Sequence, residues 1–327
     1  DFIQKFENYF PKLEKFATEI SEKVKLNNRT RYLSLCNYLR EKHQINVKDI
    51  LPQENKPFSK IFYPDKREFH LSDLLNLETK KLFTAALVAQ LEADEIIEEY
   101  LDDFSFPSDT SRKVSKVALL NYTGAAIMMP YEIFFNECVK KHRYDLELLQ
   151  STFAVSFEQV CHRVTCLNSP DPKLRGIPLH MIRVDRSGNV SKRFSLSGIE
   201  LPRLSGACPK WNVYSAFSNP GKISAAVSKM TDGEKYVCIA RTVEKGISKY
   251  GEEKGLLSIG LGCQIKYAKD FVYADGLNLN DEKSESKIGV SCRKCDRLDC
   301  GQRAFPPDTQ NYDVNINQRG VSIFVNG

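Results

Sequence analysis

The chain contains 327 residues, 42% of them hydrophobic, and its 47 Lys and Arg against 42 Asp and Glu give a formal charge of +5. Because domains usually contain roughly 100 to 200 residues, this length predicts two lobes. The charge is too small to indicate nucleic-acid binding by itself. No apolar run approaches the roughly 18 residues of a membrane span, and the start, DFIQKFENYF, is unlike a signal peptide. We therefore expect a cytoplasmic protein with no membrane partner.

The ten cysteines do not indicate a small disulfide-rich domain, because the chain is long and shows no export signal. We expect most of them to be buried free thiols. This interpretation applies to Cys36, Cys138, Cys161 and Cys166, which lie in helical patterns and fit the role of small core residues.

The first half of the chain has apolar residues at helical spacing. We expect two antiparallel helices between Asp1 and about Arg40, followed by a short hairpin in KIFYPDKREFHLSDLL. Further helices are predicted over 78–101 and 114–129, over YEIFFNECVKK, and as a shorter pair around Val155 that resembles a helix-turn-helix only generically. Acidic residues crowd one of these helices, and we interpret them as a solvated face and not as a metal site. They are Glu92, Asp94, Glu95, Glu98 and Glu99.

The pattern changes at SPDPKLRGIP, where strand-like alternation begins. LHMIRVDRSGNVSKRFSL predicts two strands around an Asp-Arg-Ser-Gly turn, and further strands are expected at 222–228, 235–243 and 256–263. We therefore predict an α+β protein. Its helical N-terminal lobe covers residues 1–171, and its mixed α/β C-terminal lobe covers residues 172–327 and carries a cysteine-ligated cluster.

The cluster is predicted from CRKCDRLDCGQRAFPP, residues 292–307, which places Cys292, Cys295 and Cys300 in C-x2-C-x4-C spacing. This spacing allows thiolates to converge on one metal centre, and it suits zinc and iron–sulfur chemistry equally. A buried strand is a poor alternative, because charged residues separate the cysteines. We therefore expect a metal or iron–sulfur site.

A closed site needs a fourth ligand, and no histidine lies beyond His180. Cys238 and Cys263 lie in strand patterns, where burial explains them, whereas Cys208 in SGACPKW lies outside regular structure. We therefore favour Cys208. The proline after it is also found after a ligand in ferredoxin patterns, which favours an iron–sulfur cluster and leaves zinc as the alternative.

The cysteine segment, together with GACPKWNVYSAFSNPGKI, FAVSFEQVCHRVTCL and IRVDRSGNVSKRFS, resembles the short-chain fatty acyl-CoA regulator family. These transcription factors include activators of propionate (methylcitrate-cycle) and glyoxylate-cycle genes. The resemblance implies an N-terminal helix-turn-helix DNA-binding domain, an ImmA/IrrE-like helical region, and a C-terminal domain that binds an acyl-CoA and holds a 4Fe-4S cluster. It implies the same four cluster ligands, Cys208, Cys292, Cys295 and Cys300. Because the chain begins with Asp and not Met, we expect the DNA-binding domain upstream.

ImmA/IrrE relatives include zinc peptidases with His-Glu-x-x-His on a helix, where two imidazoles bind zinc and the glutamate acts as base. The matching helix here reads LFTAALVAQLE, with Leu87, Val88 and Leu91 at the His, Glu and second His positions. His70 is a single histidine and does not replace the motif. No arrangement of nucleophile and base indicates acyl-CoA hydrolysis either, so we predict that the chain is not an enzyme.

Coenzyme A presents phosphates to basic groups, an adenine that stacks, and a pantetheine arm suited to an apolar tunnel. The second lobe offers basic residues beside its hairpin turn and aromatic residues in WNVYSAF. Each has a plainer interpretation, since such basic residues are often solvated and such aromatic residues often belong to a core. The candidate contacts are Arg186, Lys192, Arg193, Trp211, Tyr214 and Phe217.

We therefore interpret the chain as the effector-sensing region of a bacterial transcription regulator of carbon and fatty-acid metabolism genes. Its expected effector is a short-chain acyl-CoA, with propionyl-CoA as the example, and its expected partner is promoter DNA, reached through the upstream domain. A homodimer is expected for a protein that reads paired half-sites. The alternatives are a redox-sensing or zinc-stapled regulator that binds no acyl-CoA, and a metallopeptidase with unrecognised ligands.

Overall fold

The computed structural model describes residues 1–25, 30–53, 57–203, 206–246, 251 and 255–308, and residues 316, 317, 320–322 and 324 near the C-terminus. The chain divides into two compact units. The first contains Asp1–His142, Leu146–Gly176 and Gly246–Lys254, and the second contains Arg143–Asp145, Ile177–Lys245 and Gly255–Gly327. The predicted boundary after residue 171 lies close to the change at Gly176, but each unit also receives a short segment from the other side of that boundary.

The first unit begins with α1 (Phe2–Lys5), α2 (Pro11–Lys23) and α3 (Arg31–His43). The predicted helix pair is therefore divided once more before Pro11, where Glu7 and Asn8 adopt left-handed φ values of 50° and 54°. Pro11 suits the first turn of α2, because the N–H that it lacks would have no acceptor within the helix. Periodicity did not reveal this break, since apolar residues continue on both sides of it.

A small sheet follows, with its strands in the order β1–β3–β2. Strands β2 (Lys60–Tyr63) and β3 (Glu68–Ser72) form the predicted antiparallel hairpin. Strand β1 (Asn46–Ile50), which pairs with β3 in parallel, was not predicted. None of its residues is fully buried, so its sequence shows no apolar alternation.

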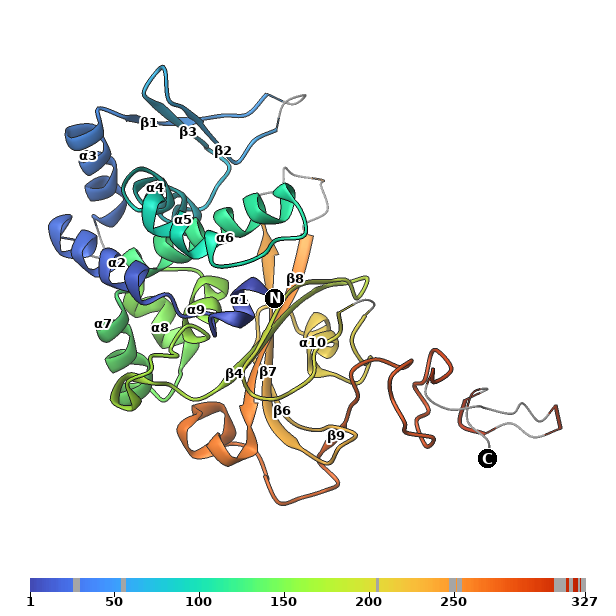
Figure 1. The fold of residues 1–327 in the computed structure, drawn as a ribbon. Coiled ribbons are helices and arrows are strands. Elements are labelled where there is room, and N and C mark those ends of the chain that lie inside the picture. The colour runs from blue at the N-terminus through green and yellow to red at the C-terminus, as the bar shows by residue number, and fades with distance from the viewer. Residues whose placement is uncertain are drawn as a thin grey trace. The chain divides into compact units, whose positions relative to one another are not determined.

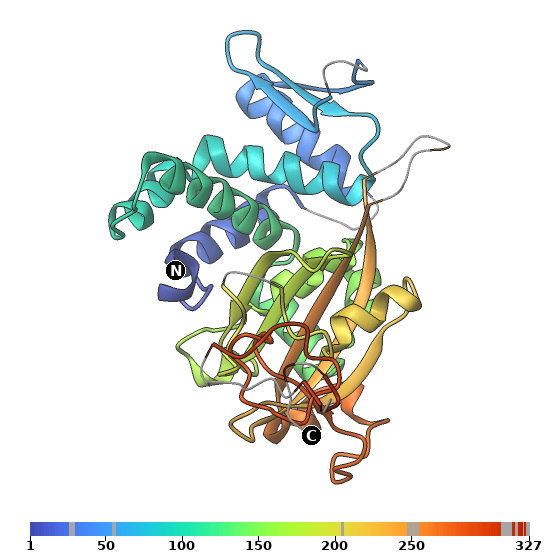
Figure 2. The same ribbon diagram turned by 90° about the vertical axis from the view of Figure 1, so that its right-hand side faces the viewer.

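Helices α4 (Leu77–Glu92), α5 (Asp94–Asp102) and α6 (Asp109–Met128) follow the small sheet. Helices α4 and α6 pack side by side, as both views show (Figure 1; Figure 2). The predicted helix over 78–101 is interrupted at Ala93, which ends α4 and begins α5.

The acidic residues of this region form ion pairs at the surface. The Lys116 ammonium lies 2.6 Å from carboxylate oxygens of both Asp94 and Glu98, and Lys12 pairs with Glu99. These pairs agree with the interpretation of Asp94, Glu98 and Glu99 as part of a solvated helix face. Glu92 differs, because its side chain is only 12% exposed and pairs with Lys42 and His43.

The first unit continues with α7 (Tyr131–Phe135), a π-helical turn (Asn136–Lys141), α8 (Leu146–Phe153) and α9 (Phe157–Val164). The predicted short pair is separated by Ala154, whose φ is 51°. Helix α9 begins with a capping box, in which Ser156 and Gln159 bond to each other's backbone N–H groups at 3.2 and 2.9 Å. These caps supply partners for the otherwise unpaired N–H groups of the first turn.

The second unit is built on a six-stranded sheet with the order β5–β4–β8–β7–β6–β9 (Figure 1). Its strands are β4 (Leu179–Asp185), β5 (Val190–Ser195), β6 (Ser224–Lys229), β7 (Lys235–Lys245), β8 (Gly255–Gln264) and β9 (Ser286–Lys287). The first five were predicted with slightly different ends, whereas β9, which pairs with β6 in parallel, was not. A two-residue strand is too short to show alternation.

The helical elements of the second unit are short. They are α10 (Asn212–Ser215) and 3-10 turns over Ala216–Ser218, Ile265–Asp270 and Val272–Ala274. The α+β class is confirmed, and the second unit depends mainly on its sheet.

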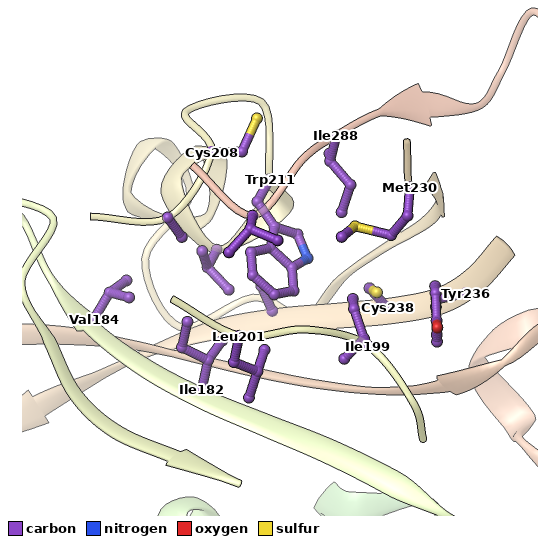
Figure 3. Packing of buried hydrophobic residues seen from close by; sticks show 14 of the residues in the cluster. Ile182, Val184, Ile199, Leu201, Cys208, Trp211, Met230, Tyr236, Cys238 and Ile288 are labelled. Atoms are coloured by element: carbon purple, nitrogen blue, oxygen red, sulfur yellow. The ribbon is translucent and has the colours of Figure 1, made fainter. Parts of the chain in front are cut away.

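Trp211, at the start of α10, lies in the middle of the core of the second unit (Figure 3). Its side chain is 2% exposed. Figure 3 shows Cys208 and Ile288 on one side of the indole and Ile182 and Leu201 on the other. The core therefore joins the sheet to the loop that carries Cys208.

Candidate functional site

Backbone hydrogen bonds tie the cysteine segment to the rest of the second unit. The Ile288 N–H donates to the Lys229 carbonyl at 2.9 Å, next to the β6–β9 pairing. The Cys208 N–H donates to the Val290 carbonyl at 3.2 Å. The fold therefore brings the Cys208 loop beside the residues that lead into Cys292, although the two segments are far apart in sequence.

The Cys208 thiol lies near two of the other predicted ligands. Burial raises its pKa, and the nearby Cys292 and Cys295 thiolates raise it further, whereas backbone hydrogen bonds from Gly289 and Lys210 act in the opposite direction. Repulsion between thiolates is relieved by a bound cation, so this proximity suits a metal centre.

Backbone atoms lie close to the sulfur atoms of Cys292 and Cys295. A β-carbon at Gly289 would lie only 2.9 Å from Cys295 Sγ, so a side chain there would displace the sulfur. The Ala304 N–H donates to Cys292 Sγ at 3.5 Å. Backbone donors near sulfur favour thiolates and tune bound clusters.

All ten cysteines are free thiols, so the donor chemistry of the four predicted ligands fits zinc or an iron–sulfur cluster. The four side chains are not all brought together, however. Within the described part of the chain, no group of three or more His, Cys, Asp and Glu side chains is arranged to hold a metal ion. Cys300 lies in a partly exposed turn, and its carbonyl accepts a hydrogen bond from the Arg303 backbone N–H at 3.2 Å. The four-cysteine ligand set therefore stays a prediction.

The remaining cysteines are mostly core residues, as expected. Cys238 and Cys263 lie on β7 and β8 with 1% and 0% exposure, and burial raises the pKa of Cys238 to about 11. Cys138, Cys161 and Cys166 are buried as well, whereas Cys36 is only partly buried.

Two aromatic candidates for acyl-CoA contact differ in their surroundings. The burial of Trp211 favours its interpretation as a core residue. Tyr214 is half-buried, and its hydroxyl accepts a hydrogen bond from the Ala207 N–H at 3.0 Å. Burial raises the pKa of Tyr214, so its hydroxyl stays protonated at neutral pH. Phe217 packs against the same core from a partly buried position.

Tyr214 also lies close to the turn between β4 and β5. A β-carbon on Gly188, within that turn, would lie 3.6 Å from the Tyr214 hydroxyl oxygen, and one on Gly206 would lie 3.7 Å from it. The turn that carries Arg186 and the loop that carries Cys208 therefore meet at one side chain.

The three basic candidates are exposed but do not share one face of the sheet. Arg186 lies in the turn, and Lys192 and Arg193 are consecutive on β5, the edge strand. Consecutive strand residues point to opposite faces. Arg193 pairs across the ladder with Ile182 of the core face, whereas Lys192 pairs with Arg183 on the other face.

The positions of the peptidase motif serve packing in this chain. Leu87 and Val88 of α4 are 2% and 0% exposed, and Leu91 follows one turn later. None of these side chains can bind zinc or act as a base.

Among the described helices, none is both long and apolar enough to cross a membrane.

Sequence reasoning missed two buried polar residues of the second unit, His180 and Arg303, which are 1% and 6% exposed. His180 hydrogen bonds through Nδ1 to the Ser197 hydroxyl at 2.8 Å, and its Nε2 lies 3.6 Å from Cys238 Sγ. Burial lowers its pKa to about 3. The available signal was a single polar residue inside the apolar run LHMI. Arg303 follows the last cysteine closely, and nothing in its sequence context marks it as buried.

Two family descriptions match the chain. One, "Short-chain fatty acyl coenzyme A regulator, C-terminal", matches residues 159–324. The other, "IrrE N-terminal-like domain", matches residues 40–165. The two matches follow one another along the chain, in the order that the resemblance implied.

Several known proteins are similar over long stretches. The HTH-type transcriptional regulator RamB of Mycobacterium tuberculosis is 33% identical over 327 residues, which cover 99% of this chain and 68% of RamB. The propionyl-CoA carboxylase regulator of Cereibacter sphaeroides is 38% identical over 72% of this chain and 50% of its own length. The HTH-type transcriptional regulator PrpR of M. tuberculosis is 32% identical over 94% of this chain and 62% of its own. The chain thus spans between half and about two-thirds of these relatives.

A solved structure, described as a Mycobacterium tuberculosis transcriptional regulator, has the same fold. It superposes with a TM-score of 0.91 at 30% sequence identity. The superposition covers 99% of this chain and 97% of that one. The likeness therefore extends through both units.

Proposed function

Because the chain belongs to the short-chain fatty acyl coenzyme A regulator family, we propose that it is the effector-sensing region of a regulator that binds a short-chain acyl-CoA. Propionyl-CoA is the effector to test first, since one relative is named as a propionyl-CoA carboxylase regulator. Promoter DNA would be contacted by a helix-turn-helix domain outside this chain, as the names of RamB and PrpR suggest. A dimer would match paired half-sites on the DNA.

The observation that carries the proposal is the meeting of three segments at Tyr214: the β4–β5 turn, α10 and the Cys208 loop. Arg186 lies on this turn and Arg193 lies on β5, the strand that follows it. Guanidinium groups recognise phosphate through paired hydrogen bonds. A ligand that binds the turn would therefore reach the cysteine loop through one side chain. Lys192, on the opposite sheet face, would contact the ligand only near the edge of the sheet.

We further propose that Cys208, Cys292, Cys295 and Cys300 hold a 4Fe-4S cluster. When bound, the cluster supplies a covalent cross-link between the Cys208 loop and the 292–300 segment. Metal ligation that joins distant segments adds directly to folding stability, so we favour a structural role. The nearness of Cys208 to Cys292 and to Cys295 supports this assignment.

Effector sensing requires two arrangements of the protein with different affinities for acyl-CoA. A ligand that bound both equally would shift nothing. In this proposal the acyl-CoA stabilises one arrangement of the turn and the Cys208 loop, and the DNA-binding domain responds to that arrangement.

The first test is native mass spectrometry of the chain purified without oxygen, before and after addition of propionyl-CoA. We expect one added mass that matches a 4Fe-4S cluster and a second that matches intact propionyl-CoA. Free coenzyme A serves as the control for acyl recognition. Zinc in place of iron, without an acyl-CoA adduct, would instead support a zinc-stapled regulator whose signal is different.

The cluster assignment is tested by Cys208→Ser, with Cys36→Ser as the matched control. Cys36 belongs to the first unit and is partly buried, so its loss should leave the iron content unchanged. Cys208→Ser should lower iron content and thermal stability together. Wild-type iron content in Cys208→Ser would remove Cys208 from the ligand set.

Two further results would favour rival functions. Hydrolysis of propionyl-CoA, or cleavage of a peptide, by the purified chain would indicate an enzyme. A change in DNA binding by the full-length protein on oxidation, with no response to acyl-CoA, would indicate a redox sensor.

A further inference from the structure

We propose that Arg303 is the positioning residue of the cysteine segment, and that its guanidinium holds the Cys292–Cys295 loop in the shape that presents sulfur to the cluster. This inference rests on the proposed cluster for its functional meaning. The shaping of the loop stands on contacts within the second unit and can be measured separately.

Arg303 is buried, and its hydrogen bonds to the described residues all go to backbone carbonyls of its own segment. One terminal nitrogen donates to the Cys292 carbonyl at 2.8 Å and to the Phe305 carbonyl at 3.3 Å. The other donates to the Cys295 carbonyl at 2.7 Å and to the Arg297 carbonyl at 2.6 Å. One side chain therefore gathers four carbonyls of a segment that has no helix or strand of its own.

These bonds orient the peptides beside two predicted ligands. In a trans peptide the carbonyl and the following N–H point in opposite directions. Because the carbonyls of Cys292 and Cys295 face Arg303, the N–H groups that follow them point away from the guanidinium. The same segment supplies the Ala304 N–H that donates to Cys292 Sγ. Arg303 therefore turns these backbone carbonyls toward itself and lets the N–H groups that follow them face the sulfur atoms.

The charge of Arg303 fits this role as well. A buried guanidinium ordinarily has an anionic partner, yet all its described hydrogen bonds end on neutral carbonyls. Its Nε is buried and has no hydrogen-bond partner among the described residues. In our proposal, thiolate sulfurs of the same loop supply the compensating negative charge. The Nε–H of Arg303 is the donor that remains available to them.

Arg297 has a different and complementary task. Its guanidinium donates to the carbonyls of Lys229 and Met230 at 3.1 and 2.9 Å, at the end of β6. Arg297 thus fastens the loop to the sheet, whereas Arg303 sets the internal shape of the loop. A lysine cannot replace either residue fully, because it lacks the planar fork that reaches several carbonyls at once.

The test compares Arg303→Lys and Arg303→Met in the whole chain, loaded anaerobically with iron and sulfide. Arg293→Lys is the matched control, since Arg293 lies in the same segment but is exposed, stacks on Phe305 at 4.7 Å and pairs with Asp308 at 3.6 Å. The readouts are iron and sulfide per chain, the rate of iron loss to a chelator, and hydrogen exchange of the backbone over 292–304. Exchange in β4, β7 and β8 reports whether the second unit remains folded in the variants.

Supporting residues around metal ligands typically change affinity by about 10- to 100-fold when replaced. We therefore expect iron loss to accelerate by about tenfold or more in both Arg303 variants, together with faster exchange in the loop. Arg293→Lys should match the wild type in both readouts. Wild-type iron retention and wild-type exchange in Arg303→Met would overturn the proposal.

The outcomes also separate this inference from the cluster itself. If the wild type binds no iron and sulfide, the proposed cluster fails, and exchange over 292–304 alone decides whether Arg303 shapes the loop. If the wild type binds the cluster and both Arg303 variants retain it equally well, only the role of Arg303 fails. Arg303→Lys keeps the positive charge, so it still tests the proposal if Arg303→Met fails to fold.

Discussion

The imidazole of His180 lies against the backbone of Gly262 on the neighbouring strand, so closely that a β-carbon there would come within 2.6 Å of His180 Cε1. His180, Gly262 and Cys238 are aligned across β4, β8 and β7. The absence of a side chain at Gly262 lets the ring extend across β8 toward the Cys238 sulfur. This row forms one wall of the core that contains Trp211.

We expect Gly262→Ala to destabilise the second unit, because the added methyl group meets the His180 ring and the Val237 carbonyl, each 2.6 Å away. Overpacking of a core typically costs about 1–3 kcal/mol. Urea unfolding followed by tryptophan fluorescence measures the effect, since Trp211 is the single tryptophan and lies in this core.

Gly276→Ala is the matched control for this prediction. A β-carbon at Gly276 would meet no heavy atom within 4 Å. Its unfolding midpoint should stay near that of the wild type. Equal midpoints for Gly262→Ala and Gly276→Ala would show that the sheet relaxes around the new methyl group.

The buried His180 should make stability depend on pH. Burial lowers its pKa to about 3 in the native state, whereas an unfolded histidine titrates near 6.5. Between these values the unfolded state binds more protons, so the free energy of unfolding falls as pH decreases through this window, by up to about 1.4 kcal/mol per pH unit. The facing groups Cys238 and Tyr236 have pKa values raised by burial to about 11 and about 12, so neither changes charge there.

The comparison of wild type with His180→Asn isolates this effect, because asparagine can bond to Ser197 without titrating. The wild type should lose stability more steeply than the variant as pH falls below about 6.5. Parallel pH profiles of the unfolding free energy would contradict the assignment of a neutral buried imidazole.

The strands of the second unit could be predicted because their apolar runs are long and end at turn residues. The 235–243 and 256–263 predictions became β7 and β8 with small extensions. The break before Pro11 and the interruption at Ala93 could not be predicted. Glu7 and Asn8 adopt left-handed backbone conformations that tertiary packing imposes. Their side chains do not indicate these conformations in the sequence.

In the candidate site, too, some features could be predicted from the sequence and others could not. Cysteine spacing and the exclusion of strand cysteines selected Cys208, and the structure places it near Cys292 and Cys295. The role of Arg303 could not be predicted, because its partners are backbone carbonyls, which are present at every residue. Side-chain patterns report what a residue can bind, whereas the fold decides which carbonyls converge on it.

In the first unit, Arg163 of α9 and Glu14 of α2 form an ion pair with contacts of 2.5 and 2.7 Å, and the Tyr122 hydroxyl donates to the same carboxylate. The two charged side chains are 1% and 5% exposed. Replacing one partner leaves the other charge buried and unpaired, which typically costs about 3–5 kcal/mol. We therefore expect Glu14→Gln or Arg163→Met alone to lower the free energy of unfolding by this amount in thermal or urea denaturation.

The Glu14→Gln/Arg163→Met double variant should regain part of the loss, because no unpaired charge remains. Glu99→Gln is the surface control. Glu99 and its partner Lys12 are more than half exposed, and such pairs contribute about 0–1 kcal/mol. A Glu14→Gln effect as small as that of Glu99→Gln would show that water reaches the buried pair.

Tyr214→Phe tests whether the cluster and the effector are coupled through one side chain. The variant leaves the Ala207 N–H, next to Cys208, without its hydrogen-bond acceptor, at a cost of about 1 kcal/mol. Under the proposed function, this hydrogen bond belongs to the arrangement that binds acyl-CoA, so we expect its loss to lower propionyl-CoA affinity by up to about fivefold, the equivalent of that cost, as measured by calorimetry on the iron-loaded chain. Tyr63→Phe in the first unit should leave the affinity unchanged.

Linkage makes this expectation sharper, because coupling between two sites is reciprocal. If Tyr214 couples the cluster to the effector site, removal of iron should weaken propionyl-CoA binding in the wild type. The same removal should weaken binding less in Tyr214→Phe. Propionyl-CoA should likewise slow iron loss to a chelator in the wild type more than in the variant. Equal effects in both proteins would mean that the turn and the Cys208 loop communicate by another route, or that each acts alone.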